Sequence, residues 1–351
     1  GSYVAAALAK GSVGDIVIAI AVMVVMVVGV NVLFWRPLVA WSEKFRFETS
    51  AAADRSRSLV LGVLRRSNVP QLLARPFLPV VRLMDQATRP LGVAEYPLHV
   101  DQRRRRAGDV IFFGVVGVVI AYGLWRALVY FDHHVGFSTF PYLLGLGGLT
   151  MLRVVVLLVF STLIWVPVGV RIGMNPRLAR LAQPVVQILA SFPAQLLFPF
   201  ATLVFVATGI PLNFGGIFLM ALGAQWYILF NTIAGASSIP TDMREMVEQF
   251  RLPTRQKWRE MILPAIFPAY VTGGITAAGG AWNASIVAEI VTFGHHHLVA
   301  KGLGSYIAEA STAGNFAKVM AGVVVMSFYV VVVNRLLWRR LYRLAETRYA
   351  I

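Results

Sequence analysis

Residues 148–172 read GLTMLRVVVLLVFSTLIWVPVGVRI, and no charged residue falls between Arg153 and Arg171. A helix needs about 20 apolar residues to cross the hydrocarbon core of a bilayer, so this stretch is long enough to span a membrane. Similar stretches recur, and hydropathy predicts about seven spans, at 14–35, 108–130, 148–172, 183–208, 214–235, 263–286 and 315–337. The sequence therefore predicts an all-α, polytopic helical membrane protein.

The composition excludes several other classes of protein. Of the 351 residues, 58% are hydrophobic and 14% are charged, whereas a soluble globular domain carries about 25% charged residues. This balance excludes intrinsic disorder, collagen and coiled coil, and it disfavours a soluble enzyme. The chain has no Cys, which excludes a disulfide framework and thiolate chemistry.

The positive charge predicts the orientation in the membrane. A net charge of +16 reflects basic cytoplasmic loops in a membrane protein, so no nucleic-acid partner is expected. The segment 36–106 holds 14 Lys and Arg against 6 Asp and Glu, whereas the loops 131–142, 209–213 and 287–314 hold one Lys and no Arg. We therefore expect 36–106, 236–262 and the C-terminus to be cytoplasmic, with 36–106 as a basic linker.

An internal repeat predicts the domain organisation. Residues 1–48 align without a gap onto 304–351, with 17 identities in 48 positions that include Tyr3, Asn31 and Trp35. Such self-similarity indicates duplication. We expect 1–35 to be the last transmembrane helix of a first repeat that is mostly missing from this sequence, and 107–351 to be a second, six-helix repeat.

The sequence contains no motif for catalysis or nucleotide binding. It lacks a P-loop, a G-x-S-x-G nucleophile elbow and an H-E-x-x-H zinc motif. The His133-His134 and His295–His297 tracts have no Cys or carboxylate ligands at motif spacing. We therefore expect no enzymatic activity, no cofactor and no metal site.

The loop 236–264 contains an amphipathic pattern. Residues 237–264 read SSIPTDMREMVEQFRLPTRQKWREMILP. Asp242 followed by Glu245 is typical of a helix start. Apolar residues then recur at helical spacing, at Met243, Met246, Val247 and Phe250. Leu252-Pro253 should break this helix, and Thr254 should cap a second short helix that ends before Pro264. Such a loop either docks another protein or lies on the bilayer.

The residues of the loop 236–264 resemble a motif of a known protein family. The loop resembles the cytoplasmic signature E-A-A-x3-G-x9-I-x-L-P of binding-protein-dependent ABC importer permeases, with Glu245 at the Glu position and Leu263-Pro264 at the final L-P. The two Ala positions hold Met246 and Val247, and the Gly position holds Arg251. The segment 190–193 (ASFP) resembles the S-x-P segment of the same family, and 280–289 (GAWNASIVAE) is similar to a stretch of its nitrate/sulfonate/taurine branch. The internal repeat is similar to the duplicated anion-transport form of that branch.

The resemblance implies a type I ABC importer transmembrane domain in a bacterial inner membrane. Its partners would be a cytoplasmic ABC ATPase dimer, a periplasmic solute-binding protein, the first permease repeat and the lipid bilayer. The substrate would be a small anion. The coupling residues implied for the ATPase contact are Glu245, Met246, Val247, Phe250, Arg251, Leu263 and Pro264.

Polar residues within the apolar runs are candidates for the translocation path. They are Ser191, Trp282, Asn283, Ser285 and Glu289. Polar groups in a bilayer normally face the bundle interior, where they contact substrate or join helices. Glu289 is expected to serve a gate or a structural pair, and Arg153 is expected to snorkel to the interface. An ion-coupled secondary transporter and a membrane scaffold stay open as alternatives.

Overall fold

The computed structural model of the protein describes residues 2–35, 37–38 and 102–349. The expected linker 36–106 therefore lies almost entirely outside the described residues. The chain divides into one unit formed by Gly1–Val27 and Tyr130–Ile351 and a second formed by Val28–Val129. Of the second unit, the structure describes the end of α2 (Val13–Val30), a short π-helix at Asn31–Trp35, residues 37–38, and α7 (Gln102–His134) as far as Val129.

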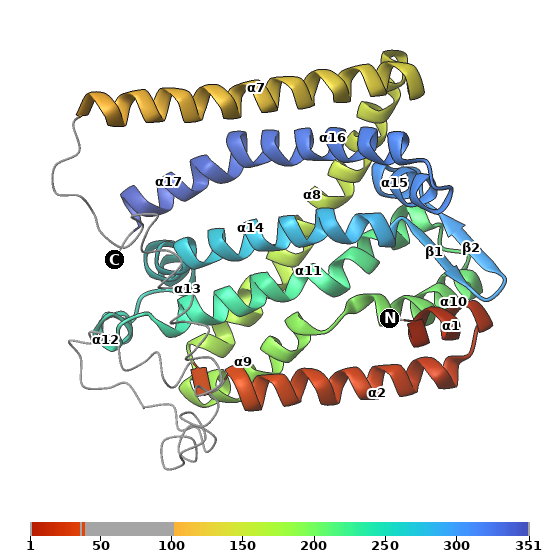
Figure 1. Cartoon of the computed structure of the whole chain (residues 1–351). Coiled ribbons are helices and arrows are strands. Elements are labelled where there is room, and N and C mark those ends of the chain that lie inside the picture. The colour runs from red at the N-terminus through yellow and green to blue at the C-terminus, as the bar shows by residue number, and fades with distance from the viewer. Residues whose placement is uncertain (1, 36, 39–101, 350–351) are drawn as a thin grey trace, which may run out of the picture. The chain divides into compact units, whose positions relative to one another are not determined.

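The first unit is built from helices and one β-hairpin (Figure 1). Its further elements in chain order are α1 (Ser2–Lys10), α8 (Phe140–Gly173), α9 (Pro176–Ser191), α10 (Phe198–Thr208), α11 (Leu212–Ser237), α12 (Thr241–Gln249), α13 (Thr254–Gln256), α14 (Leu263–Ala288), β1 (Ile290–Phe293), β2 (His296–Val299), α15 (Leu303–Thr312), α16 (Phe316–Val333) and α17 (Arg339–Arg348). We call the end with β1, β2 and α15 the hairpin end, and the end with α12 and α13 the loop end. The all-α polytopic fold predicted from the sequence is confirmed.

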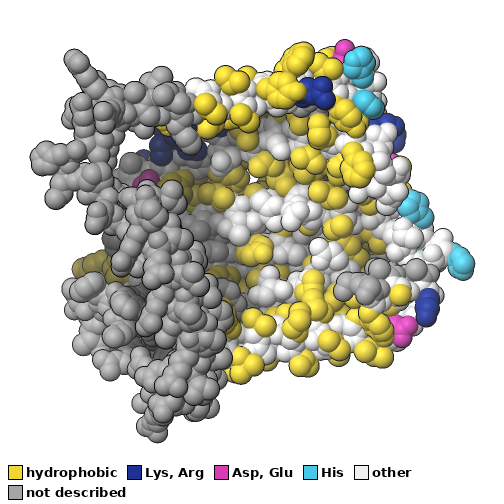
Figure 2. Space-filling view, viewed as in Figure 1, with side chains coloured by type: hydrophobic (Ala, Val, Ile, Leu, Met, Phe, Trp, Pro, Cys, Tyr) yellow, Lys and Arg dark blue, Asp and Glu magenta, His cyan; other side chains and the backbone are white. Residues whose placement is uncertain are grey.

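Among the described residues, five helical stretches are long and apolar enough to cross a membrane. They are Val13–Phe34, Phe137–Gly173, Leu212–Ser237, Thr254–Ala288 and Phe316–Arg348. The expected span 108–130 falls on α7, where a described apolar stretch covers Phe113–Gly123. Figure 2 shows hydrophobic side chains along the helices of one face and His side chains gathered towards the hairpin end.

The span expected at 183–208 is not one continuous helix. The structure instead has two helices, Pro176–Ser191 and Ala194–Thr208, which are bent by 82° relative to each other. The cause is local, because Pro193 has no N–H to donate and disfavours helical backbone at the residue before it. Phe192 is accordingly extended, with a ψ of 131°. This correction matters because a broken helix leaves room for a cavity.

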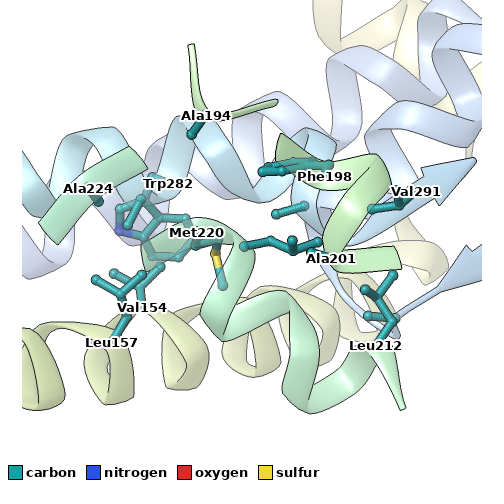
Figure 3. Close-up of a cluster of buried hydrophobic side chains, with 14 of the residues drawn as sticks. Val154, Leu157, Ala194, Phe198, Ala201, Leu212, Met220, Ala224, Trp282 and Val291 are labelled. Atoms are coloured by element: carbon teal, nitrogen blue, oxygen red, sulfur yellow. The ribbon is translucent and has the colours of Figure 1, made fainter. Parts of the chain in front are cut away.

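Helix α11 packs against both α8 and α14, and small residues allow this close approach (Figure 1). A Cβ at Gly273 of α14 would lie 2.8 Å from the carbonyl oxygen of Tyr227 in α11. The apolar core continues into the cluster of Figure 3, where Val154, Leu157, Met220 and Trp282 meet. These contacts make α8, α11 and α14 the frame that holds the rest of the unit.

The two halves of the internal repeat adopt the same local structure at the offset of 303 residues. Helix α2 (Val13–Val30) corresponds end for end to α16 (Phe316–Val333). Each is followed by a short π-helix, at Asn31–Trp35 and at Asn334–Trp338. Each is preceded by a glycine with a φ of +66°, Gly11 and Gly314. The sequence similarity is thus matched by similarity in backbone conformation.

Candidate coupling helix and translocation pocket

The amphipathic segment of the loop forms α12, from Thr241 to Gln249. Asp242 does not cap it, although the D-x-x-E pattern predicted a cap there. The N-cap is Pro240, whose carbonyl accepts from the Arg244 amide at 3.3 Å, and no side chain caps this end. Pro240 can take this place because its fixed φ suits the residue that leads into a helix.

The apolar stripe of α12 divides into an inward and an outward pair. Val247 is buried, and Met243 is partly buried beside it in a cluster that includes Met261, Ile262 and Ile266. Met246 and Phe250 instead expose 48% and 71% of their surface. Glu245 is also exposed. Val247 therefore anchors α12 to its own chain, while Met246 and Phe250 remain available to a partner.

Arg251 has a φ of +49°, in the left-handed region that favours glycine. The Arg251 amide bonds to the carbonyl of Glu248 at 3.1 Å, and the Leu252 amide bonds to that of Val247 at 3.2 Å. This pair of bonds is a Schellman motif, in which the first residue beyond the helix cap is usually glycine. The structure thus explains why the family signature has Gly at the position of Arg251.

Leu263 and Pro264 lie inside a long helix rather than after a short one. The prediction of a second short helix that is capped by Thr254 and ends before Pro264 is wrong. The N-cap is Pro253, and the helical stretch runs from Thr254 to Ala288. A π-helical stretch at Lys257–Ile262 precedes Pro264. In a regular α-helix the proline ring would clash with the carbonyl four residues earlier, which for Pro264 is that of Glu260, within the π-helical stretch.

A cavity of about 350 Å³ lies at the break between α9 and α10. Its polar side chains are Gln195 beyond the break, Tyr227 of α11 and Asn283 of α14, and among the described residues its lining holds no charged side chain. The remaining lining comes from Ala190, Phe192, Pro193, Ala194, Phe198, Leu219, Gly223, Gly280, Ala284, Ile286 and Val287. The cavity therefore combines apolar walls with neutral hydrogen-bonding groups.

The structure separates the predicted path residues. Asn283 lines the cavity, and its side chain is exposed. Ser191 sits at the break, where its hydroxyl donates to the Gln187 carbonyl at 2.8 Å. Ser285 is fully buried and donates to the Trp282 carbonyl of its own helix at 2.7 Å. Trp282 is only 4% exposed and stacks against Tyr329. Sequence reasoning did not predict that Gln195 and Tyr227 line the cavity, because the helix break brings them together.

Glu289 lies at the hairpin end and is completely buried. Its Oε1 accepts from Arg153 Nη1 at 2.6 Å and from Thr150 Oγ1 at 2.8 Å. Its Oε2 accepts the amides of Gly304 and Ser305 at 2.8 and 3.2 Å, at the start of α15. A carboxylate is favourable there because it satisfies amides that have no partner within the helix.

Arg153 does not snorkel, contrary to expectation, because its side chain is inside this cluster and the residue is 6% exposed. Besides Glu289, it donates from Nε to the Asn213 carbonyl at 3.0 Å and from Nη2 to Asn213 Oδ1 at 3.0 Å and the Lys301 carbonyl at 2.8 Å. The pair thus ties α8, α11 and α14 to the segment after the hairpin. Sequence could not reveal it, because the two residues are 136 positions apart.

Comparison with known families identifies what these elements belong to. Residues 165–350, which include α12, the cavity lining and Glu289 but not its partners Thr150 and Arg153, match the family model described as binding-protein-dependent transport system inner membrane component. The chain belongs to this family. The resemblance drawn from Glu245 and Leu263-Pro264 is thereby confirmed.

Three members of the binding-protein-dependent family are 25 to 31% identical to this chain over the residues that align. The nitrate import permease protein NrtB of Leptolyngbya laminosa is 25% identical over 184 residues, which are 52% of this chain and 62% of that protein. NrtB of Synechococcus elongatus is 29% identical, over 42% of this chain and 49% of that protein. The bicarbonate transport system permease protein CmpB of Synechococcus elongatus is 31% identical, over 38% and 47%. The chain thus spans about half to three-fifths of these relatives.

The positive φ of Arg251 allows a test of the Schellman motif at the end of α12. Arg251→Gly should stabilise the Schellman motif by about 1 kcal/mol, because a side chain at positive φ is strained and glycine is not. Hydrogen exchange at the Arg251 and Leu252 amides should slow by about fivefold, as measured by mass spectrometry. The control is Arg255→Gly, which lies in helical backbone and should not slow exchange. Faster exchange in Arg251→Gly would contradict the assignment.

Proposed function

We propose that this chain is a membrane-spanning permease subunit of an ATP-driven importer for a small anion, working by alternating access. Its partners in this proposal are a cytoplasmic ABC ATPase dimer and a periplasmic solute-binding protein. The family description, which names a binding-protein-dependent transport system, supports the second partner. The basic residues of 236–262 support a cytoplasmic location for the loop end.

The exposed face of α12 is the observation that carries the proposal. Met246 and Phe250 present apolar surface outside the spans, and the exposed Glu245 lies beside them. Val247 meanwhile fixes the helix to the core beside α14. An apolar side chain flanked by charge is typical of a contact that excludes water on binding. A movement of the ATPase can therefore reach the spans through α12.

The cavity at the α9–α10 break supports a small anion as the substrate. The amides of Asn283 and Gln195 can donate hydrogen bonds to oxyanion oxygens. Neutral donors bind an anion less tightly than a fixed cation does, which suits a site that must release its ligand. Two kinds of relative are named for nitrate and bicarbonate, which are both small oxyanions.

The alternatives explain less of the structure. An ion-coupled secondary transporter would be expected to use ionisable residues near the midplane. The buried Arg153–Glu289 pair lies at the hairpin end, and its charges are engaged in hydrogen bonds. A scaffold would not need a cavity at a helix break.

We also infer that residues 1–35 are the last helix of another permease repeat. The support is the matching succession of glycine turn, long helix and short π-helix at the offset of 303 residues. In this proposal two six-helix repeats face each other across the translocation path.

The first test of the proposed function removes the outward side chain of α12. Phe250→Asp should weaken association with the ATPase by roughly tenfold or more, because an apolar anchor is lost and a carboxylate is buried. The measurement is co-purification with the ATPase and hydrolysis stimulated by the loaded binding protein. Phe316→Asp is the control, since Phe316 is similarly exposed but lies at the start of α16, towards the hairpin end. Equal co-purification of both variants would refute docking through α12.

A second test addresses the substrate. Asn283→Asp changes one cavity group from neutral to negative at nearly constant size, so the anion should meet like charge. Uptake of nitrate or bicarbonate into proteoliposomes should fall by roughly tenfold or more, while the ATPase still co-purifies. Asn283→Ser, which keeps the site neutral, is the control. Unchanged uptake of both anions in Asn283→Asp would remove this cavity from the path.

A further inference from the structure

Arg244 lies on α12, but its side chain bonds to backbone rather than pointing freely into solvent. Nε donates to the Ile239 carbonyl at 3.1 Å, and Nη1 donates to the Met174 carbonyl at 3.2 Å. Nη2 donates to the carbonyls of Ala236 and Ser237 at 3.0 and 3.2 Å. One guanidinium therefore joins α12 to two other segments.

The accepting carbonyls lie at the C-terminal ends of two spans. Met174 is the C-cap of α8, and Ala236 and Ser237 are in the last turn of α11. Carbonyls in the last turn of a helix have no partner within the helix, and the helix dipole places partial negative charge there. A cation that bonds to both helix ends gives these carbonyls hydrogen-bond partners and also balances the partial negative charge there.

The two helix ends are already close at this point. The Ser237 hydroxyl donates to the Gly173 carbonyl at 3.2 Å, and a Cβ at Gly173 would lie 2.6 Å from the Ile233 carbonyl oxygen. Arg244 thus bonds across a junction that is closely packed beneath it. Arg244 directly precedes the exposed Glu245 in the sequence, which gives no sign that the Arg244 side chain bonds inward.

We propose that Arg244 is the positioning residue that makes α12, α8 and α11 move as one body when α12 is displaced. This inference rests on the proposed function, in which the ATPase displaces α12. Helix α11 contributes Leu219, Gly223 and Tyr227 to the cavity, so movement of α11 moves the cavity wall. Val247 and Met243 hold α12 to the core by apolar contacts, which are not directional, whereas the guanidinium fixes its orientation.

The planar shape of the guanidinium is essential to this role. Its donors spread in a fixed fork, which reaches Met174 on one side and Ala236 and Ser237 on the other. A lysine ammonium is a compact point of charge on a flexible stem and cannot reproduce the fork. Arg244→Lys should therefore keep the charge and lose most of the coupling.

The first experiment measures the position of α12 directly. The sequence has no Cys, so Glu248→Cys on α12 and Leu163→Cys on α8 can carry spin labels without background. In the full-length protein in nanodiscs, with any Cys outside this sequence replaced by Ser, the distance distribution between them should broaden in Arg244→Ala and, less strongly, in Arg244→Lys. It should stay narrow in Arg255→Ala, which removes an exposed cation from the same loop. Unchanged distributions in both Arg244 variants would overturn the proposal.

The second experiment measures coupling in the transporter reconstituted with its ATPase and loaded binding protein. Transport per ATP hydrolysed should fall by roughly tenfold in Arg244→Ala, the effect of losing about one charge-assisted hydrogen bond. Co-purification of the ATPase should persist, because Met246 and Phe250 are unchanged. If Arg244→Ala does not insert, Arg244→Lys takes its place. Normal coupling in these variants would overturn the inference.

Failure of the unmutated protein to bind any ATPase would instead refute the proposed function. The spin-label distances would still decide the role of Arg244.

Discussion

A bilayer core offers no water to bond a backbone carbonyl or amide, so each helix end near the membrane needs a partner from the protein. Two charged side chains meet this need at opposite ends of the unit. Arg244 bonds to carbonyls at the ends of α8 and α11. Glu289 accepts the first amides of α15, and its charge is balanced by Arg153. Between these two polar clusters the helices meet mainly through apolar and small side chains (Figure 3), with a few hydrogen bonds such as that from Trp165 of α8 to Gln225 of α11.

This division gives the two ends and the middle different roles. Hydrogen bonds with directional geometry hold the two ends, so each end can move as a rigid body. The break between α9 and α10 interrupts the middle and leaves a cavity with neutral polar groups. A rigid end that moves can therefore alter the walls of this cavity without unfolding a helix. The same logic accounts for the split of α12 into Val247, which faces the core, and Phe250, which does not.

Sequence reasoning succeeds where a signal extends over many residues and fails where one bond or turn decides. The length of the apolar runs is enough to predict five of the seven expected spans as single helices among the described residues. The spacing of Met243, Met246, Val247 and Phe250 is enough to predict α12. Hydropathy does not predict the bend at Pro193, because the residues on both sides of the bend are apolar. The long helix through Pro264 includes a π-helical stretch that the loop's sequence pattern does not predict. Arg153 and Arg244 resemble surface charges until their distant carbonyl and carboxylate partners are known.

The central claim is that α12 passes movement from an ATPase to the spans. A cryo-electron microscopy structure of the full-length protein with its ATPase, in a lipid nanodisc, tests it most directly. The account predicts that Met246 and Phe250 are buried against the ATPase, while Val247 keeps its contacts with Met261 and Ile262. It is contradicted if α12 lies among lipid headgroups or stays exposed while the ATPase binds elsewhere.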